Sequence, residues 1–215
     1  MIPSIHKSNV NSQLIGLNSM RDSLMRDSSM RDRCDVVNLP VLRSFNRGDI
    51  VPEILGNWVI QTGVIRTMTW DEEGSVSVLG LWGAEDLMGS ITRNIEPYQS
   101  ECLTPVVLSL LNDSQALPEL LLKQCMKMEE LLALSHCRNV GDRLLRMLYW
   151  LVRHFGVPHC DRMISGRLLD IQMTHQHLAD LTGTTRVTVT RCLGNFQRDG
   201  QIVRLRRGRF FIQSS

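Results

Sequence analysis

The chain has 215 residues, of which 43% are hydrophobic and 21% charged, so it can bury an ordinary core and is not wholly disordered. It contains no apolar run of about 18 residues and no basic and apolar leader, which excludes a membrane-spanning helix and a signal peptide and predicts a cytoplasmic protein. The net charge of +2 is uneven, because seven arginines against two aspartates give residues 174–215 a charge of +5, and this end is expected to meet a polyanion.

Six cysteines are scattered along the chain with no C-x-x-C pair, which favours reduced thiols over a disulfide framework. Most of them are expected to be small hydrophobic residues of the core. They are Cys34, Cys102, Cys125, Cys137, Cys160 and Cys192.

The first 33 residues are rich in serine, asparagine, arginine and aspartate, and a Met-Arg-Asp triplet recurs there every five residues. That period fits neither a helix nor a strand. Residues 1–33 are therefore expected to form a poorly ordered or loosely helical tail, and a partner-binding tail is the alternative.

Short β-rich segments follow, and residues 34–116 are predicted to form a small barrel or sandwich. The segment 58–70 is rich in β-branched and aromatic residues, and 75–82 alternates polar and apolar residues before it becomes apolar. The turn sequence 71–74 between the two segments predicts a hairpin. Gly63 marks an expected bend or bulge.

A long helix is predicted from Pro118, because proline suits the first turn and Glu119 complements the positive end of the helix dipole. One stripe has the spacing of a coiled-coil seam and is the predicted dimerisation surface. A second apolar face can cover the barrel, and packing on the helix's own chain alone is the alternative. The seam residues are Leu121, Cys125, Met128 and Leu132, and the second face carries Leu120, Leu131 and Leu134.

A break near 138–141 ends this helix, so 117–139 are predicted to be the dimerisation helix and hinge, and 140–215 a further domain. Apolar residues at helical spacing over 144–155 predict a second helix, which Gly156 and Pro158 terminate. A short strand is expected at 168–171.

A helix-turn-helix is predicted from Thr174 onward. The Thr174 hydroxyl can accept a hydrogen bond from a free N–H at Gln176 or His177, and so begin a helix that runs to about residue 181. Gly183 can take the positive φ of a tight turn, and a second helix is expected from Thr185 to just before residue 200.

The second of these helices separates anchoring residues from exposed ones. Val189, Leu193 and Phe196 share an apolar face. On the opposite face, an arginine early in the helix can donate two hydrogen bonds to guanine in the major groove of DNA, so Arg186 is the main predicted base reader. The other predicted base-reading residues are Val187, Thr190 and Arg191, and Arg191 is alternatively a phosphate clamp.

Two short apolar strands around an Arg-Arg-Gly-Arg turn then predict a wing whose arginines bind phosphates. Hydroxyl groups at the start of the second helix also suit phosphate oxygens, whereas His175 and Gln176 fit backbone contact and plain solvent exposure equally well. The predicted phosphate contacts are Thr174, His175, Gln176, Thr184, Thr185, Thr188, Arg204, Arg206, Arg207 and Arg209.

From about Cys34 onward, the chain resembles the CRP/FNR family of bacterial regulators in its order of barrel, long helix, hinge and winged helix-turn-helix. The stretch THQHLADLTGTTRVTVTR, at 174–191, resembles the cyanobacterial nitrogen-control branch especially closely. The resemblance implies an α+β fold with an N-terminal double-stranded β-helix, the jelly-roll barrel of cyclic-nucleotide-binding domains. Val187 stands where the cyclic-AMP receptor branch has glutamate, so the operator preference is expected to follow the valine-bearing branch.

The resemblance also implies a homodimer on a pseudo-palindromic DNA operator, with recognition helices about 34 Å apart, and RNA polymerase as a partner. Transcription activation is the expected function. A repressor of the same fold is one alternative, because operator position decides between the two. A small-molecule or redox sensor that acts mainly through protein partners is the other.

The family's cyclic-nucleotide cassette does not carry over to this chain. It needs Gly-Glu-Leu and, several residues later, an arginine followed by a small hydroxyl residue. The matching segments read DLMGS at 86–90 and YQS at 98–100, so cyclic AMP is not expected, and Arg93 is nearby but out of register. The iron–sulfur branch needs a cluster of N-terminal cysteines, where this chain offers only Cys34. No cofactor is expected, and the effector is left unidentified.

No metal or haem site is predicted, because adjacent histidine and cysteine residues on helices are more often packing or surface residues. The residues considered are His136, Cys137, His154, His159 and Cys160. The sequence has no nucleophile elbow, P-loop or H-E-x-x-H motif, so the chain is not expected to be an enzyme.

Overall fold

The computed structural model describes residues 40–89, 92, 95–113, 115–161, 164–205 and 208–213. The expected tail with its repeat and Cys34 lie outside the described residues. So do Ser90, Arg93 and two wing arginines, Arg206 and Arg207, and the side chain of Cys160.

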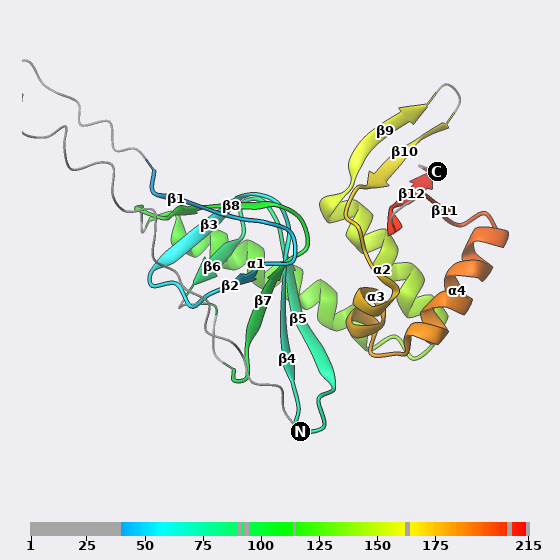
Figure 1. The fold of residues 1–215 in the computed structure, drawn as a ribbon. Helices are drawn as coiled ribbons and strands as arrows, with labels where there is room; N and C mark the ends of the chain where they lie inside the picture. The colour runs from blue at the N-terminus through cyan, green and yellow to red at the C-terminus, as the bar shows by residue number, and fades with distance from the viewer. Residues whose placement is uncertain are drawn as a thin grey trace, which may run out of the picture. The chain divides into compact units, whose positions relative to one another are not determined.

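Two four-stranded antiparallel sheets form the N-terminal part of the described chain (Figure 1). The strand order is β1-β8-β3-β6 in one sheet and β2-β7-β4-β5 in the other, and apolar side chains from both sheets share one core. This is the predicted α+β architecture with an N-terminal β domain. The strands are β1 (Leu42–Phe45), β2 (Ile50–Val51), β3 (Asn57–Thr62), β4 (Ile65–Trp70), β5 (Val76–Trp82), β6 (Leu87–Gly89), β7 (Gln99–Cys102) and β8 (Val106–Leu110).

The bend and the hairpin predicted in this region are both confirmed. Gly63 separates β3 from β4 with φ +93°, and a Cβ atom there would lie 2.2 Å from the carbonyl oxygen of Pro105, so a larger residue does not fit. The β4–β5 hairpin closes through Asp71, whose carbonyl oxygen accepts from the Gly74 N–H at 3.0 Å. Its Oδ1 accepts from the Ser75 N–H at 2.8 Å.

Helix α1 (Leu117–Ser135) carries the predicted proline in its first turn and packs one face on the barrel. Gln124 is buried, and its Nε2 donates to the Leu87 carbonyl oxygen at 3.4 Å. The Lys127 ammonium lies 2.6 Å from Oδ2 of the buried Asp86. Both contacts join α1 to β6 or to the turn before it.

A neighbouring face of α1 is apolar and exposed. In the predicted seam, Met128 is 48% exposed, Leu132 is 60% exposed and Cys125 is exposed as well. Leu121 is instead half-buried. Dimerisation through this seam stays a prediction.

Helix α2 (Val140–Phe155) begins after the predicted break. The Asn139 side chain caps it, since Oδ1 accepts from the Gly141 N–H at 2.8 Å and the Asp142 N–H at 3.2 Å. Gly156 ends the helix, as predicted. The break between α1 and α2 is therefore confirmed, and its use as a hinge stays a prediction.

A third antiparallel sheet, of order β11-β12-β10-β9, lies in the C-terminal part. The strand expected at 168–171 is longer and begins earlier, and it pairs with β9, which was not predicted. Pro158 had indicated the end of regular structure, but β9 is an edge strand, where a residue without an N–H is tolerated. These strands are β9 (Val157–Asp161), β10 (Ile164–Leu169), β11 (Val203–Arg204) and β12 (Phe210–Gln213).

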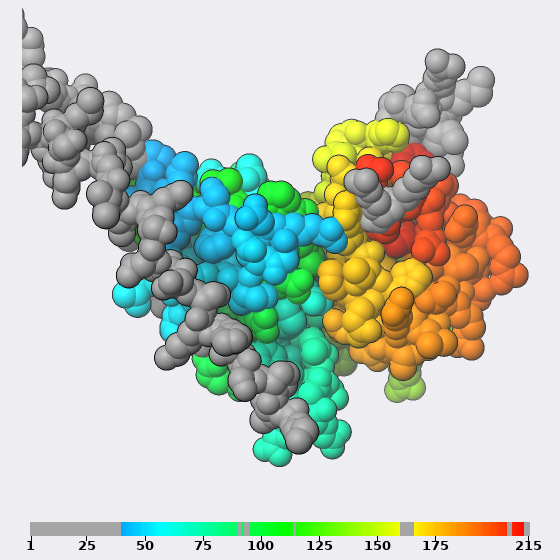
Figure 2. Space-filling model, in the orientation of Figure 1, coloured from blue at the N-terminus to red at the C-terminus, as the bar shows by residue number. Residues whose placement is uncertain are grey.

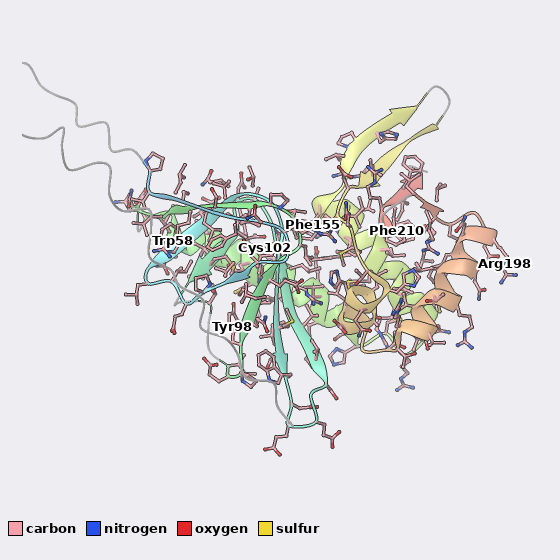
Figure 3. All side chains as sticks on the ribbon, in the orientation of Figure 1. Trp58, Tyr98, Cys102, Phe155, Arg198 and Phe210 are labelled. Carbon is pink, nitrogen blue, oxygen red and sulfur yellow. The ribbon has the colours of Figure 1, made fainter. Side chains whose placement is uncertain are left out.

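The helices α2, α3 (His175–Thr182) and α4 (Arg186–Arg198) enclose a second core with β12. Phe210 on β12 is 1% exposed and points into this core (Figure 3). Barrel residues Val64, Leu81 and Leu103 belong to the same cluster of buried side chains. The helical part and the barrel thus share apolar contacts.

The expectation for the cysteines is confirmed for Cys102, and Cys192 packs against a core, but it is wrong for Cys125 and Cys137. Of the four described side chains, only Cys102 is buried, whereas Cys125 is exposed and Cys137 and Cys192 are partly exposed. Cys125 lies on the exposed face of α1, which the sequence cannot distinguish from a core face, and Cys137 follows the end of the helix. Among the described residues, no helix combines the length and apolar character needed to cross a membrane.

Candidate nucleic-acid interface

Capping hydroxyls and a glycine turn set the geometry of α3 and α4. The Thr174 hydroxyl accepts from the His177 N–H at 3.0 Å, and the Thr185 hydroxyl accepts from the Thr188 N–H at 3.2 Å. Gly183 ends α3 with φ +56°, a left-handed conformation that glycine adopts without a steric penalty. Both helices begin and end within one or two residues of the predicted positions.

Helix α4 divides into a buried and an exposed face, as predicted. Val189 and Leu193 are fully buried, and Phe196 is 8% exposed. Val187 on the other side is 78% exposed. In Figure 2 the orange residues of α4 form a continuous outer surface. The four predicted base-reading residues Arg186, Val187, Thr190 and Arg191 are all exposed.

The hydroxyls predicted to bind phosphate gather at the start of α4. Thr185 Oγ1 and Thr188 Oγ1 lie 3.0 Å apart, beside the N–H groups of the first turn. Thr184 precedes them and is partly exposed. Gln176 on α3 is exposed, and its Nε2 donates to Asp180 Oδ1 at 2.7 Å. A helix N-terminus with free N–H groups and hydroxyls suits an anion.

The wing is an antiparallel pair of β11 and β12, as predicted. The Leu205 N–H, just after β11, donates to the carbonyl oxygen of Arg209, just before β12, at 2.9 Å. Arg204 is partly exposed, and a guanidinium nitrogen of Arg209 lies 3.1 Å from Asp170 Oδ1. Arg209 therefore already has an acidic neighbour, which the sequence pattern did not indicate.

A cavity of about 340 Å³ opens between the start of α3, the start of α4 and the wing. Three arginines line it and no described carboxylate does, so its field is positive. Arg47, in the turn between β1 and β2, was not singled out from the sequence, and its guanidinium donates to the carbonyl oxygens of Leu103 and Gln172 at 3.1 Å each. The lining residues are Arg47, Gln172, Met173, Thr174, His175, Arg186, Arg204 and Gly208.

A buried ion cluster joins the barrel to α3, and sequence reasoning missed it. Arg66 on β4 is 8% exposed. Its guanidinium lies 2.7 Å from Glu101 Oε2 on β7 and 3.0 Å from Asp180 Oδ2 on α3. The only available signal was an arginine inside a strand whose other residues are uncharged, because a buried guanidinium requires acidic partners.

His177 lies beside this cluster, and its protonation is expected to oppose folding. Burial and the charge of Arg66 lower the pKa of His177, although Glu101 and Asp180 act in the opposite direction. The unfolded chain thus binds the proton more readily, and stability is expected to fall as the pH drops below about 6.5, the ordinary histidine value. Urea unfolding at pH 7.5 and 5.5 measures this loss.

His177→Gln is the matched variant, because glutamine keeps an acceptor for the Thr174 N–H but does not titrate. We expect it to lose less stability than the wild type between the two pH values. An equal loss in both proteins would contradict the assignment.

The barrel holds a second cavity, of about 300 Å³. No described basic side chain lines it. Ser100 is 3% exposed, and its Oγ has no hydrogen-bond partner among the described residues. The lining residues are Ile50, Val51, Pro52, Glu53, Ile54, Met88, Gly89, Tyr98, Gln99 and Ser100. Figure 3 labels Tyr98, which immediately precedes β7, and Cys102, which is the last residue of that strand.

The described side chains contain no group of three or more histidine, cysteine, aspartate or glutamate residues that could hold a metal ion. Burial raises the pKa of the Cys102 thiol to about 11, with Asp49 and Glu101 adding to the effect, so this thiol stays protonated at neutral pH.

Comparisons with known proteins agree with this geometry. Residues 142–214 match the model of the Crp-like helix-turn-helix domain. The chain is 38% identical over 151 residues to the regulatory protein CysR of Synechococcus elongatus, covering 68% of this chain and 71% of that protein. It is 44% identical over 69 residues to the global nitrogen regulator of Nostoc sp., covering 32% of this chain and 29% of that one.

A solved transcriptional regulator of the CRP family from Thermus thermophilus has the same fold, with a TM-score of 0.66. It is 21% identical and covers 80% of this chain and 92% of the solved chain. Members of the family are transcription regulators and not enzymes; they bind DNA and typically act as dimers. The chain therefore belongs to the CRP/FNR family of transcription regulators and carries its helix-turn-helix DNA-binding domain.

Proposed function

We propose that this regulator recognises a pseudo-palindromic operator as a homodimer, with α4 of each copy in the major groove. The division of α4 into a buried face and an exposed face with Arg186 in its first turn carries the proposal. Arg186 is the main base reader and donates two hydrogen bonds to guanine. Val187 and Thr190 contact a neighbouring base pair, and Arg191 either reads a second base or binds a phosphate.

The backbone of the duplex is held by groups around this face. Thr184, Thr185 and Thr188 bind phosphate at the start of α4, beside its free N–H groups. Thr174 and Gln176 lie at the start of α3, and Arg204, Arg206, Arg207 and Arg209 belong to the wing. These contacts set affinity and position without reading sequence.

Two copies associate through the exposed apolar face of α1. Cys125, Met128 and Leu132 lie on this face, which no other part of the described chain covers. Burying such a side chain against the second copy contributes about 1.5 to 3 kcal/mol to the free energy of association. A two-fold axis that passes between the two α1 helices also relates the two recognition helices by the symmetry of a palindrome.

The barrel does not serve a cyclic nucleotide in this proposal. A cyclic phosphate needs a cation, and the described lining of the barrel cavity offers none. Control is by another effector or by the abundance of the protein.

We extend the proposal to activation through RNA polymerase. Transcription from a promoter that carries an upstream operator is the test. A fall in transcript would support the repressor instead.

Titration of a fluorescent duplex with purified protein tests the DNA-binding proposal. Affinity for the operator is expected to exceed that for a scrambled duplex and to fall steeply as salt rises. Equal, salt-insensitive binding of both duplexes would refute it, and would favour a sensor that acts through protein partners.

The wing arginines give a separate expectation. The double substitution Arg206→Ala and Arg207→Ala should weaken operator and scrambled DNA alike, because phosphate contacts carry no sequence information. The slope of log affinity against log salt should flatten by up to about one unit per lost contact. Arg43→Ala on β1 is the control, since Arg43 stacks over Trp58 on the barrel, 4.9 Å from the ring centroid. An unchanged slope in the double variant would exclude the wing from the interface.

A further inference from the structure

One chain of hydrogen bonds joins the wing, α3 and α4 through His175. A guanidinium nitrogen of Arg204 on β11 lies 3.0 Å from His175 Nε2. His175 Nδ1 lies 2.7 Å from Thr190 Oγ1, and Thr190 Oγ1 donates to the Arg186 carbonyl oxygen at 2.9 Å. Three separate elements of the candidate interface are thus linked by one imidazole ring.

The chemistry of these groups fixes where the protons lie. A guanidinium can only donate, so Nε2 must accept from Arg204, and the ring is neutral with its proton on Nδ1. The Nδ1–H then donates to Thr190 Oγ1, which leaves the threonine proton for the Arg186 carbonyl oxygen. Each hydrogen bond in this series therefore has one donor and one acceptor.

The surroundings of His175 oppose a charged ring. Arg204 on β11, Arg186 on α4 and Arg47 from the barrel line the same cavity, and no described carboxylate faces it there. Burial lowers the pKa of His175, and the charges of Arg204 and Arg186 lower it further. A proton on Nε2 would also point at the guanidinium of Arg204 and break that hydrogen bond.

We propose that neutral His175 is a positioning residue of the DNA-binding surface: it holds Arg204 of the wing against Thr190 of the recognition helix and does not itself contact phosphate. This inference rests on the proposed function. It replaces the phosphate contact that the sequence had suggested as one of two roles for His175.

The same chain of bonds restricts how Thr190 reads DNA. Its only hydroxyl proton is used inside the protein, so its oxygen can accept from a base but cannot donate. Thr190 is therefore expected to favour the amino group of adenine or cytosine, or to place its methyl group against thymine. Without His175, the hydroxyl is free to turn, and this preference weakens.

Operator affinity of the wild type, His175→Gln and His175→Ala between pH 5.5 and 8 tests the proposal. Glutamine is the matched variant, because its oxygen can accept from Arg204 and its amide can donate to Thr190, while it does not titrate. We expect wild-type affinity to fall relative to His175→Gln as the pH drops below about 6.5, the ordinary histidine value. At pH 8 His175→Ala should bind about three- to tenfold more weakly than His175→Gln.

A change of operator affinity with pH in the opposite direction would overturn the proposal. An imidazolium that contacts phosphate directly strengthens binding as the pH falls, so a wild-type affinity that rises relative to His175→Gln refutes the positioning role. Equal weakness of the glutamine and alanine variants at pH 8 refutes it too. Nitrogen chemical shifts of the ring in the free protein give an independent result, since the proposal requires the proton on Nδ1. If no variant binds any duplex in a salt-sensitive manner, the proposed function fails instead.

Discussion

The double substitution Met128→Glu and Leu132→Glu is expected to convert the protein into a monomer. Both side chains are exposed, at 48% and 60%, and lie four residues apart on one face of α1. In the proposed dimer each would be buried against the second copy, and its loss costs about 1.5 to 3 kcal/mol of association free energy. Four such losses, with glutamates facing one another, should raise the dissociation constant by at least about a thousandfold. Sedimentation velocity measures the change.

A matched control lies on the same helix. Leu122 and Met126 are equally exposed, at 63% and 58%, but Met126 lies about 160° around the helix from Met128. The double variant Leu122→Glu and Met126→Glu is therefore expected to stay dimeric. An intact dimer with the seam substitutions, or a monomer with the control, would show that the subunits meet on another face.

Replacement of Arg186 by alanine is expected to remove the preference for one base in each half-site. A bidentate contact to guanine accounts for about 1 to 3 kcal/mol of discrimination, and a dimer makes two such contacts. Operator affinity should fall by about 2 to 6 kcal/mol in total, while binding to scrambled DNA changes little. Anisotropy titrations with both duplexes measure the two losses.

Arg198→Ala is the control for Arg186→Ala. Arg198 is an exposed arginine on the same helix, but it lies in the last turn and extends outward (Figure 3). Its loss is expected to leave the ratio of operator to scrambled affinity unchanged. An equal fall on both duplexes for Arg186→Ala would make Arg186 a phosphate contact and not a reader.

The DNA-binding segment could be predicted in detail because its determinants are local. A capping threonine, a glycine with positive φ and an apolar stripe on α4 act over a few residues, and each is legible in the sequence. The hairpin at 71–74 and the bend at Gly63 are local in the same sense. Their positions in the structure therefore agree with the expectation to within a residue or two.

Contacts between distant segments were not predictable in this way. Arg66, Glu101 and Asp180 come from β4, β7 and α3, and no spacing in the sequence relates them. His175 and Arg204 are 29 residues apart, and they meet only because the wing folds back beside α3. Leu121 fits the periodicity of the seam, but its burial depends on how far α1 rotates toward the barrel.

Selection from a randomised duplex pool by the purified protein tests the central claim most directly. The proposed dimer predicts a two-fold symmetric motif whose half-sites are centred about 34 Å apart, one helical turn of DNA. With Arg186→Ala, one base position in each half-site should lose its preference. A motif without symmetry, or one that Arg186→Ala leaves unchanged, would contradict the claim that paired α4 helices read the operator.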